Sequence, residues 1–394
     1  MTRIRSRVWR RIAVVLTVGL AGLAPAAPSF ADNSSLGSLE QVALQIGADQ
    51  VWADGVDGAG VNVAIIDTGV APLGPFAGSG TLVAAVDLSA EQVDPTTAFV
   101  DTNGHGTHLA GIVNGVAPGA GIVSVKVAGR SGDVTLASLV TGIDWVIDHS
   151  DELNIRVLNL AFNSDTNRPY HADPLAAAVE RAWDAGIVVV TAAGNDGPDA
   201  NRLNAPANDP FVIAVAGVEA TVDGFVVPDW ASSGDGRRDP DFAAPGAHIE
   251  SLRAPGSNAD VNHSEGYVDN ETFRGSGSSQ AAAVVSGAVA LLVDARPNLT
   301  PDEVKSALTS SSSRVDGSPA VVGAGVLRID AALDAAVEGA DQNWRRANGG
   351  RQVPRAAGVS TIWSGTSWSG TSWSGTSWSG TSWSGTSWSG TSWS

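Results

Sequence analysis

The stretch FRGSGSSQAAAVVSG, residues 273–287, decides the fold. It passes from glycines and serines into an apolar run that continues to Leu292. A helix that is apolar on every side is a buried helix, so the stretch predicts a central helix entered through a flexible loop. Ser279 lies at that entry, where the free N–H groups and positive potential of a helix N-terminus suit a nucleophile. The alternative is that the serine only caps a core helix.

The first 31 residues have the pattern of an export signal. Five arginines precede the apolar run 12–23, and Ser29-Phe30-Ala31 offers small residues for cleavage. We therefore expect a secreted protein whose mature chain starts at Asp32. Removing the five arginines changes the formal net charge from −18 to −23, which argues against nucleic acid and anionic membranes as partners. The chain has no cysteine, so an exported protein of this kind must rely on a large core.

Apolar runs and helical stripes alternate between the signal and residue 340, in a pattern typical of an α/β domain. Strands are predicted at 61–66, 82–86, 122–127, 157–162 and 187–190. Helices are predicted at 136–147, from Asp173 to Gly186, after the capping box at Thr300, and at 330–337. This alternation predicts a doubly wound parallel sheet flanked by helices, in a single domain over residues 32–340.

Chemically useful side chains stand where these elements begin or end. Asp67 follows the strand 61–66, and Asn195 follows the strand 187–190. His105 lies between two glycines in DTNGHGTHLAG, where a helix is predicted to start. His108 three residues later could form a metal couple with His105, but no third ligand has a matching spacing. An acid at a strand end is often only structural, so Asp67 alone proves little.

Beyond residue 340 the composition changes. Residues 341–362 show no helical or strand period and are predicted to be a linker. WSGTS then repeats over residues 363–394, an uncharged low-complexity tail. Gly and Ser between regularly spaced tryptophans suit a flexible chain that makes several weak stacking contacts. We expect the tail either to bind a cell-envelope or polymer surface or to be a dispensable spacer.

Together, Asp67, His105, Asn195 and Ser279 are the groups that an acyl-transfer site needs: an acid, a base, an oxyanion donor and a nucleophile. The surrounding residues resemble the subtilisin-like serine peptidases, the subtilases. VAIIDTGV is similar to their acid motif, DTNGHGTHLAG to their histidine motif, AAGND to their oxyanion segment, and GSSQAAAVVSG to their nucleophile motif. The order of the three catalytic residues is that of the family.

The resemblance implies an exported serine endopeptidase with protein or peptide substrates. Ser279 would be the nucleophile, His105 the general base and Asp67 its partner, with the Asn195 side chain and the Ser279 N–H as oxyanion donors. Substrate-binding residues would be Ala161, Phe162, Asn163, Ala193 and Gly194. Asn163 stands where the family has a glycine, so we expect a narrower first specificity pocket.

Other departures concern the helix and its surroundings. Ala283 and Val284 replace the family's Pro-His, and Gln280 replaces a Met, which we expect to alter helix entry and not chemistry. Too few residues precede Asp67 for the usual inhibitory propeptide, and the loop that holds calcium in many relatives is missing after Asn114. We expect no cofactor, with weak calcium binding by acid-rich stretches left open, and a monomer.

Two other functions are compatible with the same residues. The chain could be a surface-binding protein that uses its tail on a catalytically idle scaffold. It could also be an esterase or acyltransferase, because the same triad serves many acyl groups.

Overall fold

The computed structural model describes residues 36–78, 80–164, 168–337, 339–350 and 362–363. The predicted signal 1–31, residues 351–361 of the predicted linker and all of the repeat tail after Trp363 lie outside this part of the chain.

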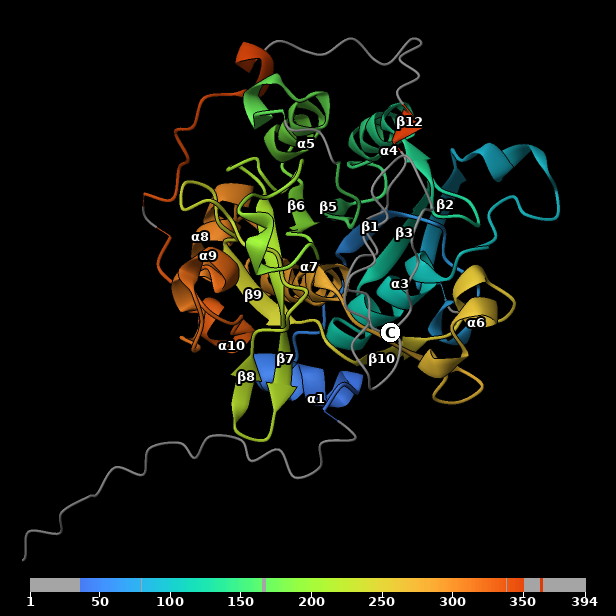
Figure 1. The fold of residues 1–394 in the computed structure, drawn as a ribbon, viewed down its shortest axis with the longest axis horizontal. Helices are drawn as coiled ribbons and strands as arrows, with labels where there is room; N and C mark the ends of the chain where they lie inside the picture. Colours follow the sequence, from blue (N-terminus) through green and yellow to red (C-terminus); the bar gives the residue numbers. More distant parts are fainter. Residues whose placement is uncertain (1–35, 79, 165–167, 338, 351–361, 364–394) are drawn as a thin grey trace, which may run out of the picture.

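One large sheet forms the centre of the domain, in the strand order β2-β3-β1-β5-β6-β7-β8, with β9 paired to β7 (Figure 1). Every pairing is parallel except that of β7 with β8. The strands are β1 (Asn62–Asp67), β2 (Leu82–Asp87), β3 (Gly121–Lys126), β5 (Ile155–Leu160), β6 (Val188–Ala192), β7 (Ile213–Thr221), β8 (Gly224–Val226) and β9 (Phe242–Pro245). The predicted single α/β domain with a doubly wound sheet is therefore confirmed.

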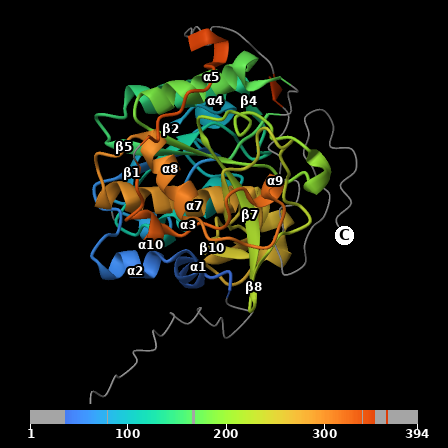
Figure 2. The ribbon, with the colours of Figure 1, turned by 90° about the vertical axis from the view of Figure 1, so that its left-hand side faces the viewer.

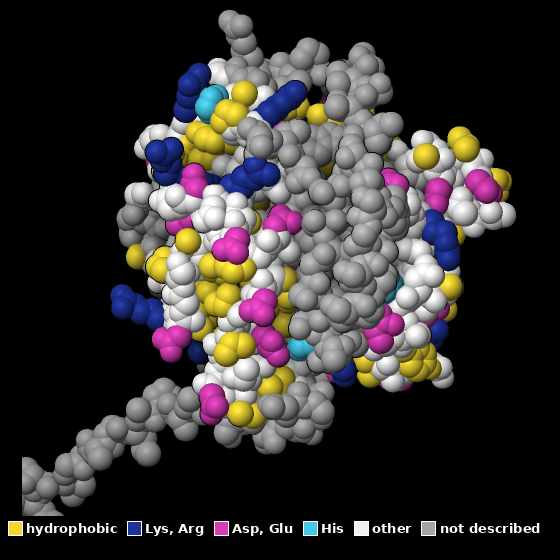
Figure 3. Space-filling view, in the orientation of Figure 1, with side chains coloured by type: hydrophobic (Ala, Val, Ile, Leu, Met, Phe, Trp, Pro, Cys, Tyr) yellow, Lys and Arg dark blue, Asp and Glu magenta, His cyan; other side chains and the backbone are white. Residues whose placement is uncertain are grey.

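Helices cover both faces of the sheet. Figure 2 shows α4 (Leu136–Asp148) and α5 (Pro174–Asp184) on one side and α3 (His105–Val116) and α7 (Ser278–Ala295) on the other. Acidic and basic side chains lie on the outer surface (Figure 3). The remaining helices are α1 (Leu39–Ile46), α2 (Ala48–Ala53), α6 (Asn258–Asn262), α8 (Pro301–Ser311), α9 (Pro319–Val322) and α10 (Ile329–Ala332).

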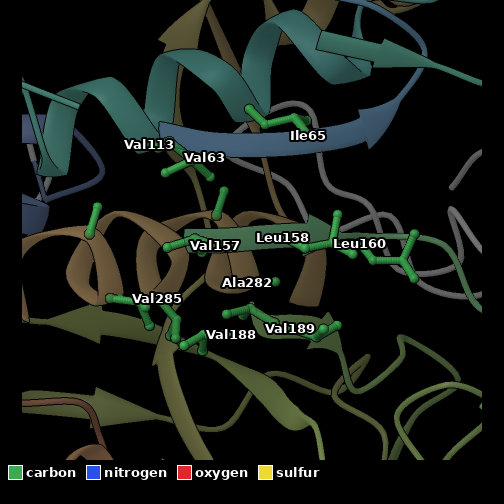
Figure 4. Close-up of a cluster of buried hydrophobic side chains, with 14 of the residues drawn as sticks. Val63, Ile65, Val113, Val157, Leu158, Leu160, Val188, Val189, Ala282 and Val285 are labelled. Carbon is green, nitrogen blue, oxygen red and sulfur yellow. The ribbon is translucent and has the colours of Figure 1, made fainter. Parts of the chain in front are cut away.

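The core forms where the sheet meets α3 and α7, because the apolar runs of the sequence face one another there. Figure 4 shows valines and leucines of β1, β5 and β6 packed against Ala282 and Val285 of α7. Residues 278–293 of α7 are all buried, as predicted for a helix that is apolar all round. By length and composition alone α7 could cross a membrane, but almost all of it is buried inside the domain.

Several predicted boundaries are corrected by the structure. The strand predicted at 157–162 ends at Leu160, so Ala161–Asn163 lie beyond β5. The helix predicted at 330–337 is only the four-residue α10. The caps were predicted correctly: Asp173 accepts from the N–H groups of Leu175 and Ala176, and Thr300 forms its capping box with Glu303.

Two short antiparallel pairs lie outside the main sheet. β10 (Ile249–Leu252) pairs with β11 (Thr272–Gly275), which leads into α7. β12 (Ile362–Trp363) pairs with β4 (Val134–Thr135), so the first tryptophan of the repeat region belongs to a two-residue strand.

Part of the predicted linker, residues 341–350, lies against the domain. The Gln342 N–H donates to the Asp302 carboxylate (2.9 Å), and the Arg346 guanidinium lies 3.8 Å from the centre of the Phe211 ring. The Ala347 N–H donates to Glu180 Oε1 (2.8 Å). These contacts tether the chain to α5 and α8 before the repeat region begins.

Candidate active site

Parallel strands end at one edge of the sheet, and this geometry positions the acid. Asp67 is the last residue of β1, between β3 and β5, and its side chain is fully buried. Its carboxylate contacts His105 Nδ1 with both oxygens, at 2.8 and 2.9 Å. The Thr68 N–H also donates to Asp67 Oδ1 (2.8 Å), which fixes the carboxylate plane.

His105 is the first residue of α3, and glycines allow the helix to begin against the strand. Gly104 has a φ of 104°, a conformation that side-chain-bearing residues rarely adopt. At Gly106 a Cβ atom would lie 2.1 Å from the Gly69 carbonyl oxygen and 3.2 Å from Asp67 Cβ. The two glycines around His105 are therefore needed for the imidazole to reach Asp67.

His108 lies on the same helix as His105 and is buried. Burial, as the larger cause, and the nearby His105, as the smaller one, lower the pKa of His108 to about 3, so His108 stays neutral. Within the described ranges, no three His, Asp or Glu side chains form a group that could hold a metal ion.

The nucleophile candidate lies at the start of α7, which packs directly against α3. Ser279 is the second residue of the helix, and 7 % of its surface is exposed. The preceding Gly277 adopts φ 155° and ψ 167°, a backbone conformation that is essentially restricted to glycine. The helix continues as one element through Ala283 and Val284.

Asn195 and the nucleophile turn are joined by hydrogen bonds. The Ser278 N–H donates to Asn195 Oδ1 (2.8 Å), and the Gly194 N–H donates to Ser278 Oγ (3.1 Å). Because Oδ1 is already an acceptor, the amide orientation is fixed and Nδ2 is left as the donor. Nδ2 lies 3.2 Å from the point where a Cβ on Gly277 would be, so a side chain there would crowd it.

The predicted substrate-binding residues lie side by side at the ends of two paired strands. Leu160 of β5 is in register with Thr191 of β6, so Ala161–Asn163 and Ala193–Gly194 leave the sheet together. Asn163 is 8 % exposed, and the next residue, Ser164, donates its N–H to the Ala205 carbonyl (2.7 Å).

One residue that organises the site was quoted in the histidine motif without a role. The buried Asp101 carboxylate accepts five hydrogen bonds, and they hold the turn before His105 and the residue after Asp67. The donors are Thr68 Oγ1, Asn103 N, Gly104 N, Thr107 N and Thr107 Oγ1, at 2.6–3.2 Å. A carboxylate four residues before the histidine, in a turn rich in N–H donors, was the signal that could have identified it.

Lys126 was also missed. Its ammonium is buried at the end of β3, where it contacts Glu91 Oε2 (2.7 Å) and donates to the carbonyls of Thr97 (3.0 Å) and Val100 (2.7 Å). A buried cation must be paired and hydrogen-bonded, so Lys126 anchors the loop that leads into Asp101.

Comparison with known proteins gives the class. Residues 58–345 match the Subtilase family. The chain is 35% identical over 297 residues to the serine protease AprX of Bacillus subtilis, covering 69% of this chain and 66% of AprX. It is 33% identical over 298 residues to subtilisin DY of Bacillus licheniformis, covering 73% of this chain and 96% of that protein.

A solved structure of a related enzyme has a similar fold. Fervidolysin from Fervidobacterium pennivorans, a keratinolytic enzyme related to subtilisin, superposes with a TM-score of 0.60 at 25% identity. The match covers 77% of this chain and 47% of fervidolysin. The chain therefore belongs to the subtilase family. It is a serine-type peptidase, which makes it a hydrolase.

Proposed function

We propose that this chain is an exported serine endopeptidase that hydrolyses peptide bonds through acylation of Ser279. The observation that carries the proposal is the contact of Asp67 with His105 Nδ1, at the start of a helix that packs against the nucleophile helix. The family supports the reaction class, and a relative named as an extracellular protease, the minor extracellular protease Epr of Bacillus subtilis, supports secretion.

The first step uses the tautomer that Asp67 selects. Because an ionised carboxylate can only accept, His105 holds its proton on Nδ1 and presents the lone pair of Nε2. Nε2 takes the proton from Ser279 Oγ as that oxygen attacks the carbonyl carbon of the substrate. The imidazolium, stabilised by Asp67, then gives the proton to the departing amine, and the acyl group stays on Ser279.

Water completes the cycle. It attacks the acyl-enzyme while His105 removes its proton, and the same imidazolium returns a proton to Ser279 Oγ as the acid product leaves. In both halves an oxyanion develops on the former carbonyl oxygen. We assign its donors as Asn195 Nδ2 and the Ser279 N–H at the positive end of α7.

The substrate would lie along the ends of β5 and β6, in contact with Ala161, Phe162, Ala193 and Gly194. Asn163 would narrow the first specificity pocket, where the family has glycine. We propose protein or peptide substrates, a monomer without a cofactor, and a tail that retains the enzyme on a cell-envelope or polymer surface.

Active-site labelling tests the function. A sulfonyl fluoride probe should label the wild-type chain and inhibit peptide hydrolysis, whereas Ser279→Ala should neither react nor hydrolyse. Ser310→Ala, on α8, is the matched control and should react like the wild type, because its hydroxyl donates to the Ala307 carbonyl (3.2 Å) within its own helix. Near wild-type hydrolysis by Ser279→Ala would refute the assignment, and ester turnover without peptide turnover would favour an esterase.

A further inference from the structure

A pocket of about 370 Å³ lies between α1, the end of β7 and the β10–β11 ribbon. We call it the α1–β10 pocket. Its volume is within the range of small-molecule sites. Leu36, Ala247 and Ile249 contribute apolar walls, and Gln45, Glu219, His248, Glu250 and Arg274 contribute polar groups. On the face of the molecule seen in Figure 3, acidic side chains gather over β7.

Gln45 lines this pocket and carries a buried acceptor. The side chain is 4 % exposed, and its Nε2 donates to the Leu36 carbonyl (2.8 Å). That bond fixes the amide, so Oε1 is the remaining acceptor, and it has no hydrogen-bond partner among the described residues. A buried acceptor without a donor destabilises the fold, and a ligand that brings an N–H group would remove that cost.

The charges of the lining favour a cation. Arg274 Nη2 binds Glu250 Oε1 at 2.6 Å, so this pair is neutral. Glu219 faces His248, with Nε2 and Oε1 3.5 Å apart. A hydrogen bond from His248 lowers the pKa of Glu219 below its usual value. The Glu219 carboxylate therefore lines the same pocket as the Gln45 acceptor, with its pKa lowered.

The walls are held in place before any ligand arrives. His248 has a φ of 59°, rare for a residue with a side chain, and its N–H donates to Ser276 Oγ (2.7 Å). Across from it, a Cβ on Gly37 would lie 1.8 Å from the His248 carbonyl oxygen, so the chain before α1 lies directly on this turn. A preformed lining of this kind lowers the cost of binding.

We propose that the α1–β10 pocket binds a primary ammonium group on a short aliphatic body, with the ammonium between Gln45 Oε1 and the Glu219 carboxylate. Anions are excluded by the same two groups. Such an ammonium has two sources. One is the new amino terminus that each peptide-bond hydrolysis creates, which rests on the proposed function; the other is the chain's own amino terminus after removal of the leader.

Calorimetric titration of the full chain with 3-methylbutylammonium chloride tests the chemistry, and 3-methylbutan-1-ol is the uncharged probe of the same shape. The ammonium should bind at least about tenfold more tightly than the alcohol, because hydrogen bonds to charged groups are stronger. Gln45→Met and Glu219→Gln should each weaken ammonium binding about tenfold or more. Glu152→Gln, in an exposed turn, should bind like the wild type.

Equal affinity for the two probes would overturn the proposal, and so would unchanged binding by Glu219→Gln. The Glu219 side chain is 37 % exposed, so this variant should fold even if Gln45→Met does not. Binding does not require turnover, so its failure leaves the peptidase assignment intact, and an inactive chain that binds the ammonium leaves the pocket assignment intact. Chains that begin at Asp32 and at Ser29 distinguish the two sources. If the longer chain binds 3-methylbutylammonium more tightly, the amino terminus at Asp32 competes for the pocket and is the ligand. If both chains bind the probe equally, the ligand is a separate peptide.

Discussion

Asp101→Asn should damage this protein more than a one-atom change suggests. The Asp101 side chain accepts three hydrogen bonds on Oδ1 and two on Oδ2, from Thr107 N (2.8 Å) and Thr107 Oγ1 (2.6 Å). An amide nitrogen cannot accept, so at least the two bonds on one side are lost whichever way the asparagine turns.

The magnitude follows from those two bonds. Hydrogen bonds to a buried charged group contribute about 1.5–3 kcal/mol each, so the free energy of unfolding should fall by about 3–6 kcal/mol. That is a large part of the usual stability of a domain and corresponds to a melting temperature lower by roughly 5–20 °C. Because the lost bonds hold the turn before His105, kcat should also fall by about 10–100-fold with little change in KM.

Thermal unfolding and steady-state hydrolysis of a short peptide measure both effects. Asp94→Asn is the matched control, since Asp94 Oδ1 accepts hydrogen bonds from Thr96 N (2.9 Å) and Thr96 Oγ1 (2.7 Å) on the exposed surface. It should leave both measurements nearly unchanged. If Asp101→Asn has the same melting temperature as the control variant, the buried carboxylate is not needed for stability. If Asp101→Asn is destabilised but keeps its kcat, Asp101 does not position His105.

Three further predictions follow from other features. Asn163→Gly should raise kcat/KM for large aromatic residues before the scissile bond by about 5–100-fold relative to small ones, and an unchanged cleavage profile would mean that Asn163 does not line that pocket. Burial, and then the charge of Glu180, raise the pKa of Asp209 to about 8, so the folded chain keeps a proton that the unfolded chain releases near 3.8. The stability from this proton is present below about pH 4 and lost as the pH rises through 8. In Asp209→Asn, the urea concentration at the unfolding midpoint should therefore depend less on pH over this window. An equal dependence of the midpoint on pH in wild type and variant would contradict this. Truncation after Gly358 should leave small-peptide kcat/KM unchanged but release the protein from its cell envelope, and retention of the truncated protein would count against a binding role for the tail.

Local patterns were enough to predict where several of the central elements begin or end, whereas β7, β8, β9 and the short helices α1 and α2 were not predicted. The apolar runs predicted β1, β2, β3 and β6 to within a residue or two, and the caps at Asp173 and Thr300 set the starts of α5 and α8. The apolar run after Ser279 likewise predicted a buried α7. These features depend on neighbours a few residues away, through backbone periodicity and capping, so the sequence carries them directly.

The candidate site was predicted as a set of residues, not as an arrangement. The resemblance of the motifs identified Asp67 and His105, but their contact requires a glycine at position 106. A Cβ atom there would lie 2.1 Å from the Gly69 carbonyl oxygen. Only the folded chain shows that backbone approach, because it joins segments almost 40 residues apart.

Other features depended entirely on tertiary structure. The Asp101 carboxylate gathers donors from both sides of the site, and Ser278 joins the nucleophile turn to Asn195. Gln45, which lines the α1–β10 pocket, has a buried oxygen without a partner among the described residues. Each is a polar group whose partner, or missing partner, is decided by burial and by residues distant in the chain. The sequence by itself determined the periodicity of the elements and the chemical groups. Packing decided which of those groups meet, because a hydrogen bond depends on distance and angle in space.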